Sequence, residues 1–201
     1  MTEILENLKK AVIEYDVEGA GTWARKAVEE GVDPVQAANV LTDSIRKVGE
    51  GFGRGELFIT DLVMAAEVMK NAMPVLEGEI KKKGKKRETL GSIVLGTVMG
   101  DIHDIGKALV SALLTAEGFE VVDIGIDISA EKFIEAIKKN KPDILAMSAL
   151  MTTTAPEQGK VIEALSKEGL RKTVKIMVGG GAITDEFSKN IGADGYGATA
   201  P

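Results

Sequence analysis

From about residue 91 onward, short apolar runs rich in β-branched residues alternate with segments of helical periodicity. The strand-like runs lie near residues 92–98, 121–125, 144–150, 175–180 and 195–199. The helical segments lie near residues 104–117, 130–140, 156–168 and 184–191. Strands that alternate with helices form a parallel sheet with helices on both faces, a doubly wound α/β fold. Such folds bind ligands at the carboxyl ends of their strands, so a site is expected in the loops that follow them.

The N-terminal part of the chain has a purely helical pattern. Asp16 and Asp33 each stand just before an apolar stripe at helical spacing, where a helix N-cap is expected. A glycine-rich stretch over residues 49–59 predicts a turn, and Thr60 or Asp61 begins the next helix. The pattern predicts a small four-helix bundle.

A basic segment separates these two patterns, since six of the seven residues from Lys81 to Arg87 are basic. We interpret it as a solvated, mobile linker rather than as a docking patch. The predicted organisation is a helical domain over residues 1–83, a linker over 84–90, and a flavodoxin-like (Rossmann-like) five-stranded domain over 91–201.

Composition and net charge argue against several classes of function and of metal site. The formal net charge of −6 and the isoelectric point near 5.0 argue against broad binding of nucleic acid, which needs a basic face. No apolar run approaches the roughly 18 residues of a membrane span, and the N-terminus lacks the layout of a signal peptide, so the cytoplasm is the expected location. The chain has no cysteine and one histidine, so it cannot build a zinc site from these ligands alone.

That histidine, His103, lies in the segment Gly-Asp-Ile-His-Asp-Ile-Gly-Lys over residues 100–107, directly after a predicted strand. A lone histidine near a strand end is ordinarily a surface residue or a satisfied core residue. Here Asp101 precedes it by two positions and can accept the N–H of one ring nitrogen, which would fix the tautomer and raise the basicity of the other nitrogen. His103 is therefore a candidate metal ligand.

Two further motifs follow at informative distances. Residues 107–147, 41 in number, lead to Ser148-Ala149-Leu150, and residues 151–178, 28 in number, lead to three consecutive glycines at 179–181. The glycines alone would be read as an ordinary turn. Together, Asp-x-His-x-x-Gly, Ser-x-Leu and Gly-Gly in this order resemble the cobalamin-binding signature of base-off, histidine-on corrinoid proteins such as the B12 domain of methionine synthase. A helical domain ahead of this domain is the layout of methyl-carrying corrinoid proteins.

The resemblance implies roles for particular residues. His103 would be the lower cobalt ligand of a cobalamin or related cobamide, replacing the cofactor's own benzimidazole. Asp101 would hydrogen-bond the imidazole, and Thr154 would supply the hydroxyl that is a serine in methionine synthase. The remaining cofactor-binding positions implied around the ligand loop and the displaced nucleotide tail are Ile102, Asp104, Ile105, Gly106, Ser148, Leu150, Thr152, Gly179, Gly180 and Gly181.

In the helical half, Phe52, Ile59 and Leu62 fall where the family places apolar residues over the upper face of the cofactor. The alternative is plain bundle core, which is an equally good interpretation for Leu62. Phe52 favours the capping role because it falls in the predicted glycine-rich turn, where a core aromatic is less expected.

The function implied by the resemblance is a corrinoid carrier that passes a methyl group from a donor-specific methyltransferase to an acceptor methyltransferase, with a reductive activator as a further partner. By itself the chain is not expected to catalyse transfer. Two alternatives are the small subunit of an adenosylcobalamin mutase, which would lack the helical domain, and a B12-dependent sensor, which would need an output domain. Methylamines, methanol, betaines and methoxylated aromatics all fit as methyl donors.

Overall fold

The computed structural model describes residues 2–201, and these divide into two compact units. The first comprises the residues up to Leu90 together with Ala112–Gly118, and the second comprises Gly91–Ser111 and Phe119–Pro201. Over the described part of the chain, none of the helices has the length and apolar character needed to cross a membrane.

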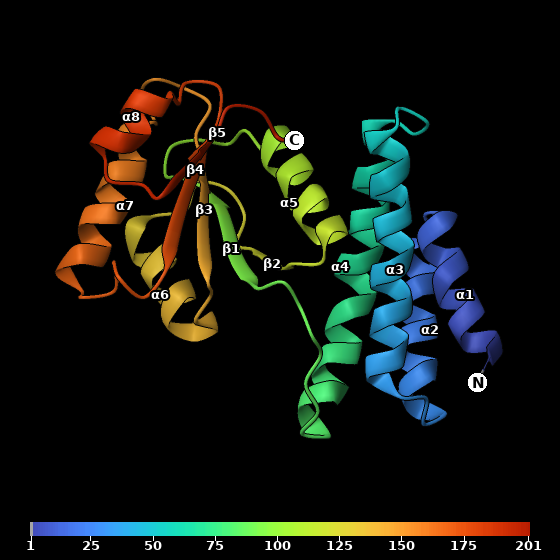
Figure 1. Cartoon of the computed structure of the whole chain (residues 1–201). Helices are drawn as coiled ribbons and strands as arrows, with labels where there is room; N and C mark the ends of the chain where they lie inside the picture. The colour runs from blue at the N-terminus through green and yellow to red at the C-terminus, as the bar shows by residue number, and fades with distance from the viewer. Residues whose placement is uncertain (1) are drawn as a thin grey trace. The chain divides into compact units, whose positions relative to one another are not determined.

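The first unit is built from four helices (Figure 1): α1 (Thr2–Ile13), α2 (Val17–Glu29), α3 (Pro34–Gly53) and α4 (Ile59–Lys82). The carboxylates of Asp16 and Asp33 accept the backbone N–H groups of Gly19 and Val35 at 2.9 and 3.0 Å, which confirms both predicted N-caps. The apolar stripes meet in one core that includes Leu8, Val12, Leu41, Ile45, Leu62 and Leu76. The predicted helical bundle is confirmed.

The predicted turn over residues 49–59 is shorter than expected. Helix α3 continues to Gly53, so Phe52 lies in its last turn and not in a loop. Gly51 is buried there, and a Cβ on it would come within 2.8 Å of the Leu57 side chain. Glycine in a helix costs about 1 kcal/mol of stability relative to alanine. At Gly51 this cost is offset by the close packing of the Leu57 side chain against the backbone.

Much of the basic segment is paired with acidic residues of the same unit. The Arg87 side chain is 9% exposed, donates to Thr42 Oγ1 at 3.0 Å and lies 3.6 Å from the Glu77 carboxylate. The Lys85 ammonium lies 3.0 Å from Asp33, and Lys83 lies 3.5 Å from Glu79. The expectation of a solvated segment is therefore wrong at Arg87, whose side chain is nearly buried against Thr42 and Glu77.

The second unit is a five-stranded parallel sheet with the order β2-β1-β3-β4-β5, which confirms the flavodoxin-like prediction. Its strands are β1 (Ser92–Thr97), β2 (Glu120–Asp123), β3 (Ile144–Ser148), β4 (Lys175–Gly179) and β5 (Gly195–Gly197). Its helices are α5 (Ile105–Glu117), whose last turns belong to the first unit, α6 (Ala130–Asn140), α7 (Pro156–Lys167) and α8 (Asp185–Asn190).

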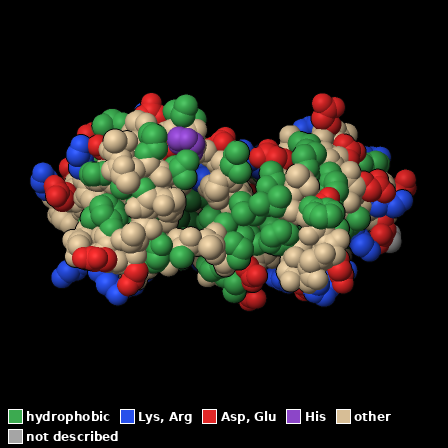
Figure 2. Space-filling model, turned by 90° about the horizontal axis from the view of Figure 1, so that it is seen from above, with side chains coloured by type: hydrophobic (Ala, Val, Ile, Leu, Met, Phe, Trp, Pro, Cys, Tyr) green, Lys and Arg blue, Asp and Glu red, His purple; other side chains and the backbone are tan. Residues whose placement is uncertain are grey.

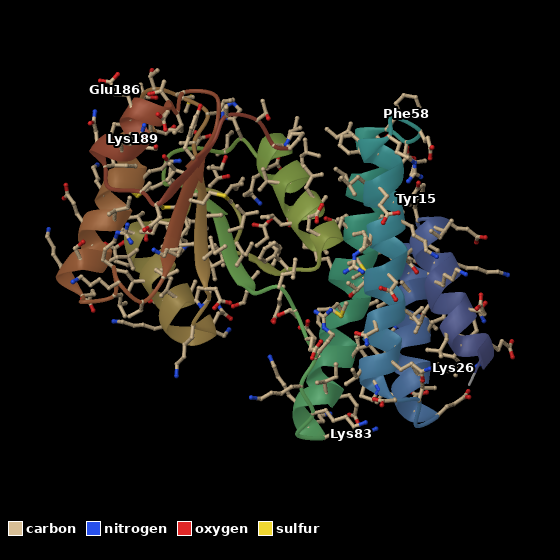
Figure 3. All side chains as sticks on the ribbon, viewed as in Figure 1. Tyr15, Lys26, Phe58, Lys83, Glu186 and Lys189 are labelled. Atoms are coloured by element: carbon tan, nitrogen blue, oxygen red, sulfur yellow. The ribbon has the colours of Figure 1, made fainter. Side chains whose placement is uncertain are left out.

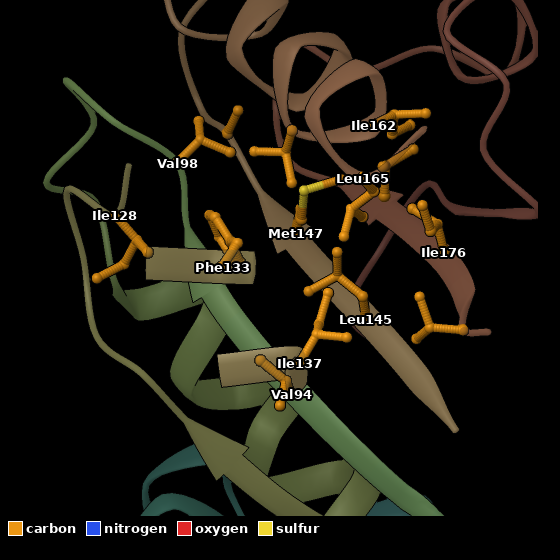
Figure 4. Close-up of a cluster of buried hydrophobic side chains, with 14 of the residues drawn as sticks. Val94, Val98, Ile128, Phe133, Ile137, Leu145, Met147, Ile162, Leu165 and Ile176 are labelled. Carbon is orange, nitrogen blue, oxygen red and sulfur yellow. The ribbon is translucent and has the colours of Figure 1, made fainter. Parts of the chain in front are cut away.

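A core of apolar side chains joins the sheet to α6 and α7 (Figure 4). Phe133 of α6 is fully buried, and it is accompanied by Val94, Ile137, Leu145, Leu165 and Ile176. Gly96 of β1 makes room for Phe133, since a Cβ there would lie 2.9 Å from the aromatic ring. This packing fixes the position of the strand from which the histidine loop departs.

Strand register aligns the ends of four strands. Thr97 pairs with Ser148, Ser148 with Gly179, and Gly179 with Gly197. The strand order reverses direction between β1 and β3, and this switch point is where an open α/β sheet forms its ligand crevice. The loops after β1 and β3, which contain His103 and Leu150, therefore lie where the sequence predicted a site.

Replacing Arg87 by alanine should destabilise the helical unit by about 1–2 kcal/mol, because Thr42 and Glu77 lose a nearly buried partner. Lys86→Ala, at an exposed neighbouring position, is the matched control and should stay within about 0.5 kcal/mol of the wild type. The only tryptophan of the chain, Trp23, lies in α2, so its fluorescence during urea unfolding reports on this unit. Equal midpoints for the two variants would contradict the anchoring role of Arg87.

Candidate functional site

The loop that carries His103 runs from the end of β1 to the start of α5. It turns at Gly100, which has φ +77, and Asp101 N donates to Val98 O at 3.2 Å. The hydroxyl of Thr97, a fully buried residue at the end of β1, donates to His103 O at 3.1 Å and thereby links the two ends of the loop. The backbone of the loop is thus held at both ends before any ligand is considered.

The centre of the site is the carboxylate of Asp101, which is fully buried. One oxygen accepts the backbone N–H of His103 at 3.1 Å and lies 2.7 Å from His103 Nδ1. The other accepts Thr154 Oγ1 at 2.6 Å and the backbone N–H of Leu150 at 2.8 Å. Donors from the loops after β1 and β3 therefore converge on one side chain.

These hydrogen bonds determine the charge of Asp101. Burial alone would raise the pKa of its carboxyl, but the bonds from the Thr154 hydroxyl, the His103 ring and two backbone N–H groups outweigh it. The pKa of Asp101 therefore lies well below its usual value, and the group is a carboxylate at neutral pH. An ionised Asp101 can only accept hydrogen bonds, so His103 Nδ1 must be the donor.

The ring of His103 is presented outward. Its side chain is 47% exposed although its Nδ1 is engaged by Asp101, and the remaining nitrogen, Nε2, is left without a proton in the neutral ring. Within residues 2–201 no three His, Cys, Asp or Glu side chains are grouped so as to hold a metal ion. The exposed Nε2 is thus a single nitrogen that could act as a metal ligand.

Figure 2 shows hydrophobic side chains close to the histidine. Ile102 and Ile105, on either side of His103 in the chain, are 70% and 82% exposed. Further exposed apolar residues on the loops after β1, β2 and β3 are Met99, Ile126, Leu150 and Met151. A soluble protein seldom leaves so many large apolar side chains exposed on neighbouring loops unless a ligand or partner covers them. These residues fit a broad, largely apolar ring lying over the histidine.

The three glycines at the end of β4 differ in what they allow. At Gly180, with φ +123, a Cβ would lie 2.0 Å from the carbonyl oxygen of Ala149, so no side chain fits. At Gly181 the nearest atom would be the flexible end of Leu150, at 2.7 Å. Gly180 is thus required by the protein's own backbone packing, a reason that the sequence pattern did not supply.

The remaining predicted residues fall in three environments. Ser148 is half-buried at the end of β3, while Asp104, Gly106 and Thr152 are exposed in the same region of the second unit. In the helical unit, Phe52 is half-buried and Ile59 is 41% exposed, whereas Leu62 is fully buried in the bundle core. Phe58, which the sequence analysis passed over, is 77% exposed at the start of α4 (Figure 3).

Three further residues of the site were missed. Thr97 supports the histidine loop, and Asp127 accepts the backbone N–H of Gly100 at 2.7 Å. The fully buried amide of Gln158 donates to the carbonyls of Met147 and Gly179 at 3.1 and 3.2 Å, and its Oε1 has no partner. Only Asp127 carried a usable signal, because it is an acidic residue in a loop that follows a predicted strand.

Comparison with known proteins shows the family of this chain. A family described as B12 binding domain matches residues 91–201, and a second family of the same description matches residues 4–77. Trimethylamine corrinoid protein 2 of Methanosarcina mazei is 42% identical over 98% of this chain and 91% of its own length. The chain belongs to the corrinoid proteins. Such proteins bind cobalamin or a related cobamide, and the exposed Nε2 with its apolar surroundings fits that cofactor.

Other corrinoid proteins are similar over the same extent. Dimethylamine corrinoid protein 1 of Methanosarcina mazei is 42% identical over 98% of this chain and 91% of its own length. A chain in the crystal structure of the methanol:cobalamin methyltransferase complex MtaBC from Methanosarcina barkeri matches with a TM-score of 0.80 and 32% identity, covering 98% of this chain and 75% of that one. The two-part fold is therefore shared with corrinoid proteins of methyltransferase systems.

Thr154→Val should destabilise the second unit of the ligand-free protein by about 1.5–3 kcal/mol, since buried Asp101 loses a hydrogen bond to its charged form. Thr154→Ser keeps the hydroxyl and should recover most of that loss. Urea unfolding followed by circular dichroism measures both variants, and Trp23 fluorescence checks that the helical unit is unaffected. A valine variant as stable as the serine variant would mean that the hydroxyl does not support Asp101.

Proposed function

We propose that this corrinoid protein holds its cobamide in the base-off, histidine-on form, with His103 Nε2 as the lower ligand, and carries a methyl group between two methyltransferases. The observation that carries the proposal is the chain of contacts from the exposed His103 ring through buried Asp101 to Thr154. When bound, the corrinoid supplies a cobalt that can take up and release a methyl group.

The chain's own residues would act on the imidazole and its surroundings. Asp101 holds the proton of His103 at Nδ1 and thereby keeps Nε2 free to act as a ligand. The Thr154 hydroxyl stabilises the charge of Asp101, so the basicity of the ring depends on two residues behind it. Ile102, Ile105 and Leu150 would cover the face of the ring system and exclude water from the ligand.

The nucleotide tail would lie toward the ends of β3 and β4. Ser148 and Thr152 offer hydroxyl groups there, and Gly106 and Gly181 have no side chains of their own to fill the space. In the helical unit, Phe52 and Ile59 are proposed to cover the upper face. Leu62 would support them from the bundle core, because it is itself fully buried.

The methyl donor is proposed to be a methylated amine. Relatives named for trimethylamine and dimethylamine are each 42% identical over 98% of the chain. The similarity to a chain of a methanol:cobalamin methyltransferase complex supports a methyltransferase as partner. The proposal assigns two such partners, a donor-specific enzyme and an acceptor-specific one. A reductive activator is proposed in addition, and the cytoplasm is the proposed location of the whole system.

The two parts of the chain are proposed to have different roles. Residues 1–83 would form the cap over the cofactor, residues 84–90 the connection, and residues 91–201 the corrinoid-binding domain.

His103→Ala should retain the folded sheet but remove nitrogen from cobalt. Electron paramagnetic resonance of the cobalt(II) form checks this, because an axial nitrogen splits the cobalt signal. Glu135→Ala, at an exposed position of α6 outside the site, is the control for the same unit and should keep the wild-type splitting. Nitrogen splitting that persists in His103→Ala would contradict the assignment of the ligand.

Transfer should depend entirely on partner enzymes, since the chain has one histidine, no cysteine and no cluster of metal ligands over residues 2–201. The protein loaded with a methylated cobamide would be incubated with a thiol acceptor, with and without a methyltransferase. For loading, purified trimethylamine, dimethylamine and methanol methyltransferases would be compared. Transfer without any enzyme would contradict the carrier role, and loading by the methanol enzyme alone would contradict the proposed donor.

A further inference from the structure

The loop between β2 and α6 runs beside the loop that carries His103. Thr97 N donates to Gly125 O, and Ile128 N donates to Thr97 O, each at 3.0 Å. Val98 and Ile128 form a parallel bridge beyond the ends of the strands. The histidine loop is therefore paired along its side with a second loop, in which the role of Asp127 is still to be explained.

Asp127 makes the most direct of these contacts. Its carboxylate accepts the backbone N–H of Gly100 at 2.7 Å, and its own N–H donates to Asp101 O at 3.1 Å. The two bonds run in opposite directions and hold consecutive residues of the histidine loop. Because Asp101 in turn contacts the ring of His103, a shift of its backbone would be passed on to the imidazole.

The backbone of Asp127 is itself unusual. Its φ is +53, in the left-handed region, which Asp adopts more readily than most non-glycine residues and which Tyr15 and Lys141 also adopt in this chain. Such a conformation costs free energy and persists only where its surroundings enforce it. At Asp127 the hydrogen bonds to Gly100 and Asp101 supply that enforcement.

The loop between β2 and α6 is anchored at its β2 end by a partly buried ion pair. The ammonium of Lys107, which is 5% exposed, contacts the carboxylate of Asp123. The other oxygen of Asp123 accepts the backbone N–H of Gly125 at 2.9 Å. The loop is thus tied to the first turns of α5, the helix that begins two residues after His103.

We infer that Asp127 is a positioning residue for His103: by holding Gly100 and Asp101 it keeps the imidazole in the tautomer with Nδ1–H toward Asp101 and bare Nε2 outward. That an unprotonated Nε2 serves to bind cobalt rests on the proposed function, but the tautomer of His103 is a property of the ligand-free protein. It can therefore be measured without cobamide.

Three variants of the full-length chain separate the possible causes. Asp127→Asn keeps an oxygen acceptor and tolerates the left-handed backbone. Asp127→Gly keeps the backbone conformation but removes the acceptor. Lys141→Gly changes another left-handed residue, with φ +48 at the end of α6, and controls for added chain flexibility.

The measurement is a two-bond proton–nitrogen spectrum of the imidazole, recorded over a series of pH values so that the neutral ring is identified from its own nitrogen shifts. The chain has one histidine, so its ring signals need no assignment. Wild type, Asp127→Asn and Lys141→Gly should show mainly the Nδ1–H tautomer. In Asp127→Gly the ratio of Nδ1–H to Nε2–H should fall about 2- to 10-fold, as expected for the loss of one hydrogen bond.

A ratio in Asp127→Gly equal to that of the wild type would overturn the inference, and so would an equal fall in Asp127→Asn. A check that needs no variant is hydrogen exchange in the wild type, where the Gly100 amide should be protected by its bond to Asp127. Exchange at the rate of a free amide would also overturn it. The expected tautomer without nitrogen splitting of the cobalt signal would contradict the proposed function instead, and leave the role of Asp127 standing.

Discussion

A buried carboxylate is costly unless donors surround it, and the arrangement of this site follows from satisfying Asp101. The donors come from the ring and backbone of His103, the backbone of Leu150 and the hydroxyl of Thr154. Charge-assisted bonds of this kind are short and roughly twice as strong as neutral ones. The loops after β1 and β3 are therefore held together at the switch point of the sheet by one charge, and the histidine takes its orientation from that charge.

Much of this was predictable because the signals are local. Alternating apolar runs gave the strands and helices of the second unit, and the spacing of three motifs placed His103, Ser148 and the glycines at strand ends that register then aligned. The N-caps at Asp16 and Asp33 were equally local. The N-caps depend only on neighbouring residues, and the alignment of the strand ends follows from the parallel α/β fold itself.

The features that the sequence analysis did not predict depend on contacts between residues far apart in the chain. The end of α3 at Gly53 depends on Leu57 packing against Gly51, and the position of Arg87 depends on Thr42 and Glu77. Asp127 acquires its role only because β2 lies beside β1. Composition identified a basic segment and a glycine-rich stretch. It could not predict which side chains elsewhere in the chain would contact them.

The backbone packing at Gly180 has a consequence for engineering the cofactor pocket. Gly180 leaves room for the carbonyl of Ala149, and the next residue, Leu150, directs its N–H at Asp101. A side chain introduced at Gly180 to reshape the proposed space for the nucleotide tail would press on the same peptide that donates to Asp101, the partner of the proposed cobalt ligand His103. Selectivity for the nucleotide tail and tuning of the metal cannot be varied independently at that position, whereas Gly181, facing a flexible leucine, leaves them separable.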